Sequence, residues 1–292
     1  MTAQTPTRSR NEWRQQLLAY ALIAPPIIMV FALLLYPALQ SFVRTLVDVP
    51  GSTGGISFAR YEAFFQDQVS INNLIFTIQM TVLSTLGLFL VCFPLALYLR
   101  FSSSRIAGWV QSIALFPLFV PGIMLSYALI RFLRPRGMLE TFLNLFGAAD
   151  GYETPYLKPL GIIIGLVWEG IPFTLLILTA GLRQVDNSLI ESARDVGANT
   201  LQIFWRILLP LTARSALIAF CLNFIGIFGS YTIPYLLGPA APQMMGIFMQ
   251  RTFQEFQRPQ EAETQAVITF LMCLIVGLLY VYAVTRQRAD QR

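Results

Sequence analysis

Six stretches of about 20 predominantly apolar residues dominate this 292-residue chain. The hydrocarbon core of a bilayer is about 30 Å thick, and a helix of about 20 apolar residues crosses it. Only 12% of the residues are charged, about half the share in a soluble domain, so a soluble core could not cover this apolar surface. The sequence predicts an all-α polytopic membrane protein with six transmembrane helices, over residues 17–39, 74–99, 108–130, 160–182, 216–237 and 266–284.

The chain lacks the residues that most enzyme sites need. It has no histidine, which excludes Ser-His-Asp and Cys-His catalysis and histidine-based zinc sites. Its three cysteines, Cys92, Cys221 and Cys273, each lie in an apolar run and are expected to be buried packing residues. No G-x-x-x-x-G-K-[ST] phosphate loop occurs, so we expect ATP hydrolysis, if any, on another protein. We expect a chain that is not an enzyme and binds no metal or cofactor.

Basic residues predict which side of the membrane each loop faces. Six helices place both termini on one side, where 12 basic residues accompany 5 acidic ones. The opposite side has 8 basic and 9 acidic residues, although Arg131, Arg134 and Arg136 cluster there. The positive-inside rule therefore predicts cytoplasmic termini in a bacterial inner membrane. The net charge of +5 is explained by these loops, so no nucleic-acid partner is expected.

One long cytoplasmic loop, residues 183–215, has the composition of ordered structure. Loops of this length are usually functional or disordered. Ser188 and Glu191 form a capping-box pattern that predicts the start of a helix. Gly197 predicts the end of that helix, because glycine adopts the left-handed conformation at little cost.

A second short helix is predicted to follow in the same loop. Asn199 or Thr200 can cap it, and apolar residues then repeat at helical spacing. Pro210 predicts a break or bend before the fifth span. The product is a helix, a glycine turn and a helix at the cytoplasmic surface, an element suited to a groove in a partner protein.

Residues in this loop resemble the EAA motif of binding-protein-dependent ABC permeases. Glu191-Ser192-Ala193 is followed after three residues by Gly197 and after nine more by Ile207-Leu208-Leu209-Pro210. Only Ser192 departs from the E-A-A, G, I-x-L-P pattern. The resemblance implies a type I ABC importer permease fold, whose loop helix inserts into a cleft of the cytoplasmic ATPase. The implied coupling residues are Glu191, Ser192, Ala193, Arg194, Asp195 and Gly197.

The resemblance also implies domain boundaries and partners. The expected partners are an ABC ATPase dimer that binds ATP and magnesium, a second permease subunit, and a periplasmic or lipid-anchored solute-binding protein. A heterodimer of permeases is favoured over a homodimer. The expected segments are a cytoplasmic tail over 1–16, a first transmembrane helix over 17–39, a periplasmic loop over 40–71, a five-helix permease core over 72–286 and a cytoplasmic tail over 287–292.

Glu169 is the one acidic residue well inside a predicted span. Intramembrane carboxylates usually face a cavity or a partner, so Glu169 and the adjacent Trp168 are candidates for a substrate pathway that favours cations. A purely structural Glu169, bonded to a neighbouring helix, is the alternative. The weaker pathway candidates are Asn223, Tyr231 and Tyr127.

The solute is the least constrained feature. Residues 229–238, together with the EAA region, resemble the spermidine/putrescine permeases, which favours a polyamine or another small charged organic solute. Phosphonates, iron complexes and sugars are alternatives. A different class of protein, a stand-alone secondary transporter, would carry inverted repeats and intramembrane charge pairs, and neither is evident in the sequence.

Overall fold

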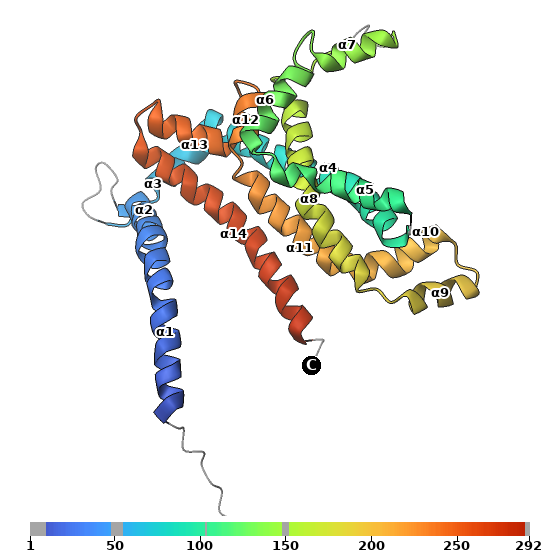
Figure 1. The fold of residues 1–292 in the computed structure, drawn as a ribbon. Coiled ribbons are helices and arrows are strands. Elements are labelled where there is room, and N and C mark those ends of the chain that lie inside the picture. Colours follow the sequence, from blue (N-terminus) through green and yellow to red (C-terminus); the bar gives the residue numbers. More distant parts are fainter. Residues whose placement is uncertain (1–9, 48–54, 103, 148–151, 290–292) are drawn as a thin grey trace, which may run out of the picture. The chain divides into compact units, whose positions relative to one another are not determined.

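The computed structural model describes residues 10–47, 55–102, 104–147 and 152–289, and every regular element within them is helical (Figure 1). The chain divides into two compact units, Met1–Ala63 and Phe64–Arg292. Among the described residues, five helices are long and apolar enough to cross a membrane, and one bent helix pair supplies a sixth span if counted as one. The predicted all-α, multi-span fold is confirmed.

In the first unit, α1 (Arg10–Val30), a π-turn over Phe31–Leu35 and α2 (Tyr36–Val47) follow one another without a gap. The apolar part of this rod, Tyr20–Val47, is longer than the predicted span over residues 17–39. The chain then turns back, and the Thr45 hydroxyl lies 2.6 Å from the Tyr61 hydroxyl. Tyr61 belongs to α3 (Ala59–Gln66), a helix that the sequence analysis did not predict.

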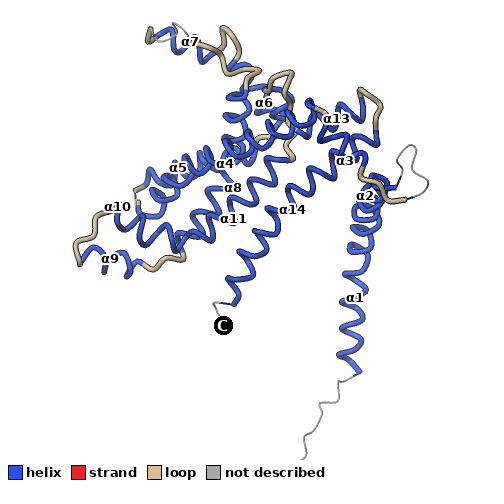
Figure 2. The backbone as a smooth tube through the Cα atoms, turned by 180° about the vertical axis from the view of Figure 1, so that it is seen from behind, coloured by secondary structure: helices blue, strands red, loops and turns tan. Residues whose placement is uncertain are grey.

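The second unit is built on α4 (Gln68–Phe101) and α8 (Pro159–Arg183), which pack along one another. Helix α11 (Leu209–Phe228) covers both, and α14 (Pro259–Ala289) packs on α11 (Figures 1 and 2). Small residues let the helices approach closely, as membrane helices require. A Cβ on Gly170 would lie 2.7 Å from the side chain of Leu88, so this glycine makes room for a fully buried leucine.

The third predicted span is not one helix. In place of a single helix over residues 108–130, α5 (Arg105–Leu115) and a 3₁₀ turn lead to α6 (Gly122–Leu133). The segments Arg105–Phe119 and Gly122–Leu145 are bent by 108° relative to one another. Pro117 lies in the 3₁₀ turn and Pro121 directly before α6. Each proline removes a backbone donor and restricts the residue before it, which explains why an uninterrupted apolar run still bends.

The fifth predicted span, over residues 216–237, is also broken. Helix α11 ends at Phe228, and α12 (Thr232–Leu237) is a separate short helix. Gly229 is the C-terminal cap residue of α11. Two further helices in the loops were not predicted, α7 (Met138–Leu145) and α13 (Met245–Gln254).

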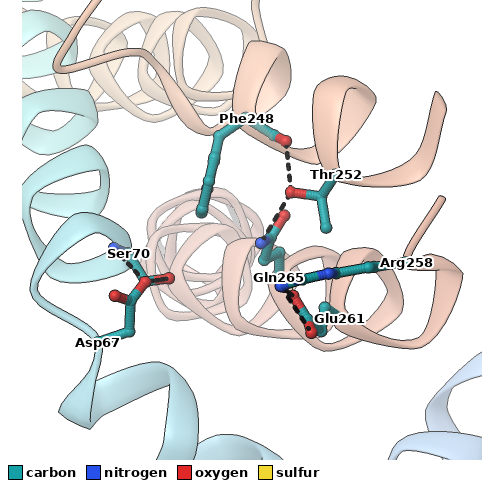
Figure 3. Close-up of polar contacts among 7 residues, drawn as sticks. All are labelled: Asp67, Ser70, Phe248, Thr252, Arg258, Glu261 and Gln265. Carbon is teal, nitrogen blue, oxygen red and sulfur yellow. Dashed lines mark hydrogen bonds and ion pairs between the residues drawn. The ribbon is translucent and has the colours of Figure 1, made fainter. Parts of the chain in front are cut away.

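Buried polar contacts fix the corner between α13 and α14 (Figure 3). The Gln265 amide donates to the Thr252 hydroxyl at 3.2 Å, and that hydroxyl donates to the Phe248 carbonyl at 2.9 Å. Thr252 and Gln265 are almost fully buried, so these bonds satisfy the Thr252 hydroxyl and the Gln265 amide N–H, which would otherwise be costly to desolvate. The corner is therefore held by specific bonds as well as by apolar packing.

Candidate functional site

The loop between α8 and α11 forms the predicted helix, glycine turn and helix. Its first helix, α9, spans Asn187–Asp195. The predicted cap was wrong: Asp186 caps α9 by accepting a hydrogen bond from the Ser188 N–H at 3.1 Å. Asp186 has an extended backbone and directly precedes the first helical residue, Asn187, so its carboxylate can accept from the free N–H of Ser188 in the first turn. Ser188 is already inside the helix and cannot occupy the cap position.

Gly197 ends this helix as predicted. Its φ is +84°, in the left-handed region, and its N–H donates to the Arg194 carbonyl at 2.8 Å. The next N–H, of Ala198, donates to the Ala193 carbonyl at 3.0 Å. A Cβ on Gly197 would meet nothing within 4 Å, so the backbone conformation and not the space calls for glycine. The turn also presents Val196, which is 84% exposed.

Helix α10 (Thr200–Ile203) follows with a reciprocal cap. Asn199 Oδ1 accepts from the Gln202 N–H at 2.8 Å, and Gln202 Oε1 accepts from the Asn199 N–H at 2.9 Å. Asn199, one of the two predicted caps, is thus confirmed. The predicted break at Pro210 was wrong, because a π-turn over Phe204–Leu208 leads directly into α11. Proline is tolerated there since it lies in the first turn of α11.

Helix α9 has one anchored face and one free face. Ile190 is buried in the core, and Ala193 packs against the core. The other predicted coupling residues are exposed: Glu191, Ser192, Arg194, Asp195 and Gly197. The helix is therefore held by the permease on one side and presents charged groups and a tight glycine turn on the other.

Arg100 holds this loop to α4, a role that the sequence analysis missed. Its guanidinium donates to the Leu182 carbonyl at 3.2 Å, to the Val185 carbonyl at 3.2 Å and to Asn187 Oδ1 at 2.6 Å. It thus caps the C-terminal end of α8, where a positive charge is favourable, and contacts the first residue of α9. The sequence offered only a basic residue at the end of a span, which indicates topology and no contact.

Two of the five predicted pathway residues line one pocket. Glu169 and Asn223 border a pocket of about 290 Å³ between α8 and α11. Glycines widen it on both helices, Gly170 on α8 and Gly226 on α11. The Glu169 carboxylate also lies beside the start of α6, since a Cβ on Gly122 would be 2.9 Å from its Oε1. Glu169 is exposed in the single chain.

Asn223 is also a bond between helices. It is 7% exposed, and its Nδ2 donates to the Thr174 hydroxyl at 2.9 Å and to the Ala219 carbonyl at 2.8 Å. Thr174 is fully buried and donates in turn to the Gly170 carbonyl at 2.8 Å. Asn223 therefore both lines the pocket and joins α11 to α8. Its partner Thr174 was not among the predicted site residues.

The other three candidates lie elsewhere. Trp168 is half-buried and packs on the core. Tyr231 stacks on Tyr235 with ring centroids 5.2 Å apart, and Tyr127 is 61% exposed on α6. None of the three borders the pocket that holds Glu169. Within the described part of the chain, no group of three or more acidic, cysteine or histidine side chains could hold a metal ion.

Two permeases of known transport systems are similar to this chain in sequence. The chain is 27% identical over 211 residues to the spermidine/putrescine transport system permease protein PotB of Escherichia coli (strain K12), which covers 72% of this chain and 77% of that protein. It is 23% identical over 280 residues to the sulfoquinovosyl glycerol transport system permease protein SmoG of Agrobacterium fabrum, covering 91% of this chain and 89% of that protein.

A solved structure has the same fold over nearly the whole length. The bacterial alginate ABC transporter, in complex with its alginate pentasaccharide-bound periplasmic protein, matches with a TM-score of 0.75 and 19% identity, covering 97% of this chain and 98% of that chain. Residues 92–289 match the family described as binding-protein-dependent transport system inner membrane component, and the chain therefore belongs to this family, as a membrane-spanning permease subunit of an ABC importer.

Proposed function

We propose that this permease couples to a separate ATPase through residues 183–215 and carries a polyamine or another small charged organic solute. Both termini and this loop lie in the cytoplasm in this proposal. The observation that carries the coupling role is the two-sided α9, with Ile190 buried and Glu191, Arg194 and Asp195 exposed beside the left-handed Gly197. ATP and magnesium bind the ATPase, and this chain holds neither.

The geometry of the turn supports insertion into a cleft. With φ at +84° and no neighbouring atom near its missing side chain, Gly197 lets a partner approach the backbone closely. Exposed Arg194 and Asp195 then offer one charge of each sign to the cleft wall. Movement of α9 reaches the membrane through Arg100, which bonds both the end of α8 and Asn187.

Glu169 supports a cationic solute. A carboxylate inside a span is costly unless it faces a cavity or a partner, and Glu169 faces the pocket between α8 and α11. A pocket of about 290 Å³ fits a small organic molecule, and a negative charge favours a cation over an anion. The likeness to a permease named for spermidine and putrescine supports the same class of solute.

The exposure of Glu169 also supports a second permease. In the single chain this carboxylate is exposed, and lipid would be an unfavourable neighbour for it. We propose that a second permease subunit of different sequence closes the pocket, and that a solute-binding protein docks on the outer side. The pathway then runs between the two permeases, past Glu169 and Asn223.

Affinity purification from membranes in mild detergent, followed by mass spectrometry, tests the assembly. We expect a P-loop ATPase, a second permease and a solute-binding protein to co-purify. Calorimetry of the recovered binding protein against spermidine, putrescine and a panel of sugars then tests the solute. A binding protein that takes only sugars would overturn the polyamine assignment, and a chain that never recovers an ATPase would contradict the proposed coupling through residues 183–215.

Glu169→Gln tests the pathway directly. In proteoliposomes that contain the recovered complex, we expect this variant to lower the uptake of radiolabelled spermidine at least about tenfold, because glutamine lacks the negative charge that attracts a cation. A tenfold change corresponds to about 1.4 kcal/mol of lost interaction. Glu153→Gln is the matched control, since Glu153 is exposed in a loop and pairs with Lys158. Equal uptake by both variants would remove Glu169 from the pathway.

A further inference from the structure

Three arginines cluster at the C-terminal end of α6: Arg131 in its last turn, and Arg134 and Arg136 directly after it. They lie on the side that the positive-inside rule makes poor in basic residues. All three side chains are exposed, and within the described residues none of their guanidiniums has a hydrogen bond or ion pair. The nearby acid Glu140 accepts a hydrogen bond from the backbone N–H of Arg136 at 2.7 Å. This cluster is unexplained by coupling or by the substrate pocket.

The backbone holds one of these arginines in an unfavourable conformation. Residues 134–137 form a tight turn, closed by a bond from the Gly137 N–H to the Arg134 carbonyl at 2.8 Å. Arg136 has φ of +57°, in the left-handed region that favours glycine. Strain of this kind persists where the surroundings impose it, often at binding sites. The turn holds Arg136 between Arg134 and α7.

Helix α7 beside this turn has an uncovered apolar stripe. Met138, Phe142, Leu145 and Phe146 repeat at helical spacing and are between 55% and 78% exposed. The ring centroids of Phe142 and Phe146 are 5.1 Å apart, and among the described helices α7 packs mainly on α6. Both views of the fold show α7 projecting beyond the packed helices of its unit (Figures 1 and 2).

The arginines and the apolar stripe share one hollow. Its volume is about 380 Å³, and its walls include the three arginines together with Met138, Phe142 and Leu145. Positive charge and exposed apolar surface in one hollow match an amphiphile that has an anionic head and an apolar tail. Amphipathic segments that combine basic residues with an apolar helix face lie in the interface between lipid headgroups and acyl chains.

We propose that this hollow binds the phosphate headgroup of an anionic phospholipid in the outer leaflet, with the acyl chains along α7. One guanidinium group can bind two phosphate oxygens through two parallel N–H···O bonds. The apolar stripe on α7 adds hydrophobic contact with the acyl chains, so headgroup and chains are both bound. A free phosphate or an acidic protein surface would satisfy the arginines and leave Phe142 and Leu145 uncovered. The assignment to the outer leaflet depends on the proposed function, because it requires the Arg183 end of α8 to be cytoplasmic.

Native mass spectrometry of the purified complex tests this proposal. The complex is delipidated, incubated with equal amounts of phosphatidylglycerol and phosphatidylcholine, and analysed for retained lipid. We expect a preference for phosphatidylglycerol that falls at least about fivefold in the Arg131→Gln/Arg134→Gln variant, since each arginine near a membrane surface contributes about that factor. Arg136 is kept so that the turn is unchanged. The matched control is Arg251→Gln/Arg258→Gln, whose arginines already pair with Glu255 and Glu261.

Four outcomes would overturn the proposal. These are a wild-type complex without lipid preference, an unchanged preference in the Arg131/Arg134 variant, an equal loss in the control, or weaker binding of the co-purified solute-binding protein with lipid retention unchanged. If the arginine variant does not fold, Phe142→Ser is used, and we expect it to retain less of both lipids. Recovery of the ATPase is measured in the same samples, so a failure of the proposed coupling is seen separately.

Discussion

The Arg100 guanidinium donates to Oδ1 of Asn187 over 2.6 Å, which joins the last turn of α4 to the first residue of α9. The same guanidinium binds the carbonyls of Leu182 and Val185. One side chain thus connects three helices at the base of the proposed coupling loop. If the ATPase moves α9, this contact transmits the movement to α4 and α8 together.

Arg100→Ala is expected to uncouple ATP hydrolysis from transport. Each lost hydrogen bond to a charged donor costs about 1.5–3 kcal/mol, so α9 would no longer follow α8. We expect the complex to assemble and solute-stimulated ATPase activity to fall at least about tenfold, a change of about 1.4 kcal/mol. Arg105→Ala is the control, because Arg105 is exposed and has no bond within the described residues. Normal stimulation in Arg100→Ala would contradict the assignment.

Gly197→Asp is expected to abolish transport and weaken ATPase association at least about tenfold, a loss of about 1.4 kcal/mol. A side chain at φ of +84° costs about 1–2 kcal/mol and would obstruct the partner. Gly147→Asp is the matched control, because Gly147 has φ of +65° and equally open space but follows α7. Pull-down of the ATPase and thermal unfolding separate the two effects. Similar ATPase recovery from both variants would exclude a special role for Gly197.

Asp67 predicts a pH-dependent start of α4. Donation from the Ser70 hydroxyl at 2.6 Å lowers the pKa of Asp67 below its ordinary value. A lowered folded-state pKa stabilises the fold above the unfolded-state pKa, near 3.9, and this contribution is lost as pH falls through the folded-state value. Hydrogen exchange of the first turn of α4 is therefore expected to quicken, relative to Asp67→Asn, below about pH 4.

Asp67→Asn is the useful control because asparagine caps a helix equally well and does not titrate. Asp67→Ala should show the quicker exchange at every pH, since loss of a cap costs about 0.5–2 kcal/mol. Exchange that changes with pH in the same way for aspartate and asparagine would show that another group titrates there.

Hydropathy predicted helix positions well and helix breaks poorly. The span predicted over residues 160–182 corresponds to α8 (Pro159–Arg183), because length and apolar content alone define it. The bend between α5 and α6 lies inside an unbroken apolar run, and hydropathy carries no information about the direction of a helix axis. Proline marks a possible bend, but Pro172 lies inside an unbroken α8. Which proline bends its helix depends on how neighbouring helices pack.

The candidate site also has one part that the sequence predicts and one part that it does not. Gly197 and Asn199 follow from local backbone chemistry, which a sequence displays directly. The bonds of Arg100 join residues 82 to 87 positions apart, and the bond from Asn223 to Thr174 joins residues 49 apart. No local pattern encodes such contacts, since they exist only once the helices have packed.

Gly181 and Ser215 offer a test of that packing. A Cβ on Gly181 would lie 2.4 Å from the Ser215 side chain, so Gly181→Ala is expected to separate α8 from α11. Overpacking of this kind typically costs about 1–3 kcal/mol. The double variant Gly181→Ala/Ser215→Gly should recover most of the loss, as measured by thermal unfolding in detergent. A double variant as unstable as the sum of its parts would mean that these residues do not meet.

The bond between Asn223 and Thr174 has a consequence for how the importer cycles. Sliding α11 by one residue along α8 shifts it about 1.5 Å, enough to break a hydrogen bond of 2.9 Å. Asn223 would keep its bond to Ala219 within α11, but the buried bond between the helices would be lost, which is costly, so we expect α8 and α11 to move as one unit. Glu169 lies on α8 and therefore moves with this pair of helices. The pocket beside Glu169 can then widen only where α8 and α11 do not bound it, at α6 or at the proposed second permease.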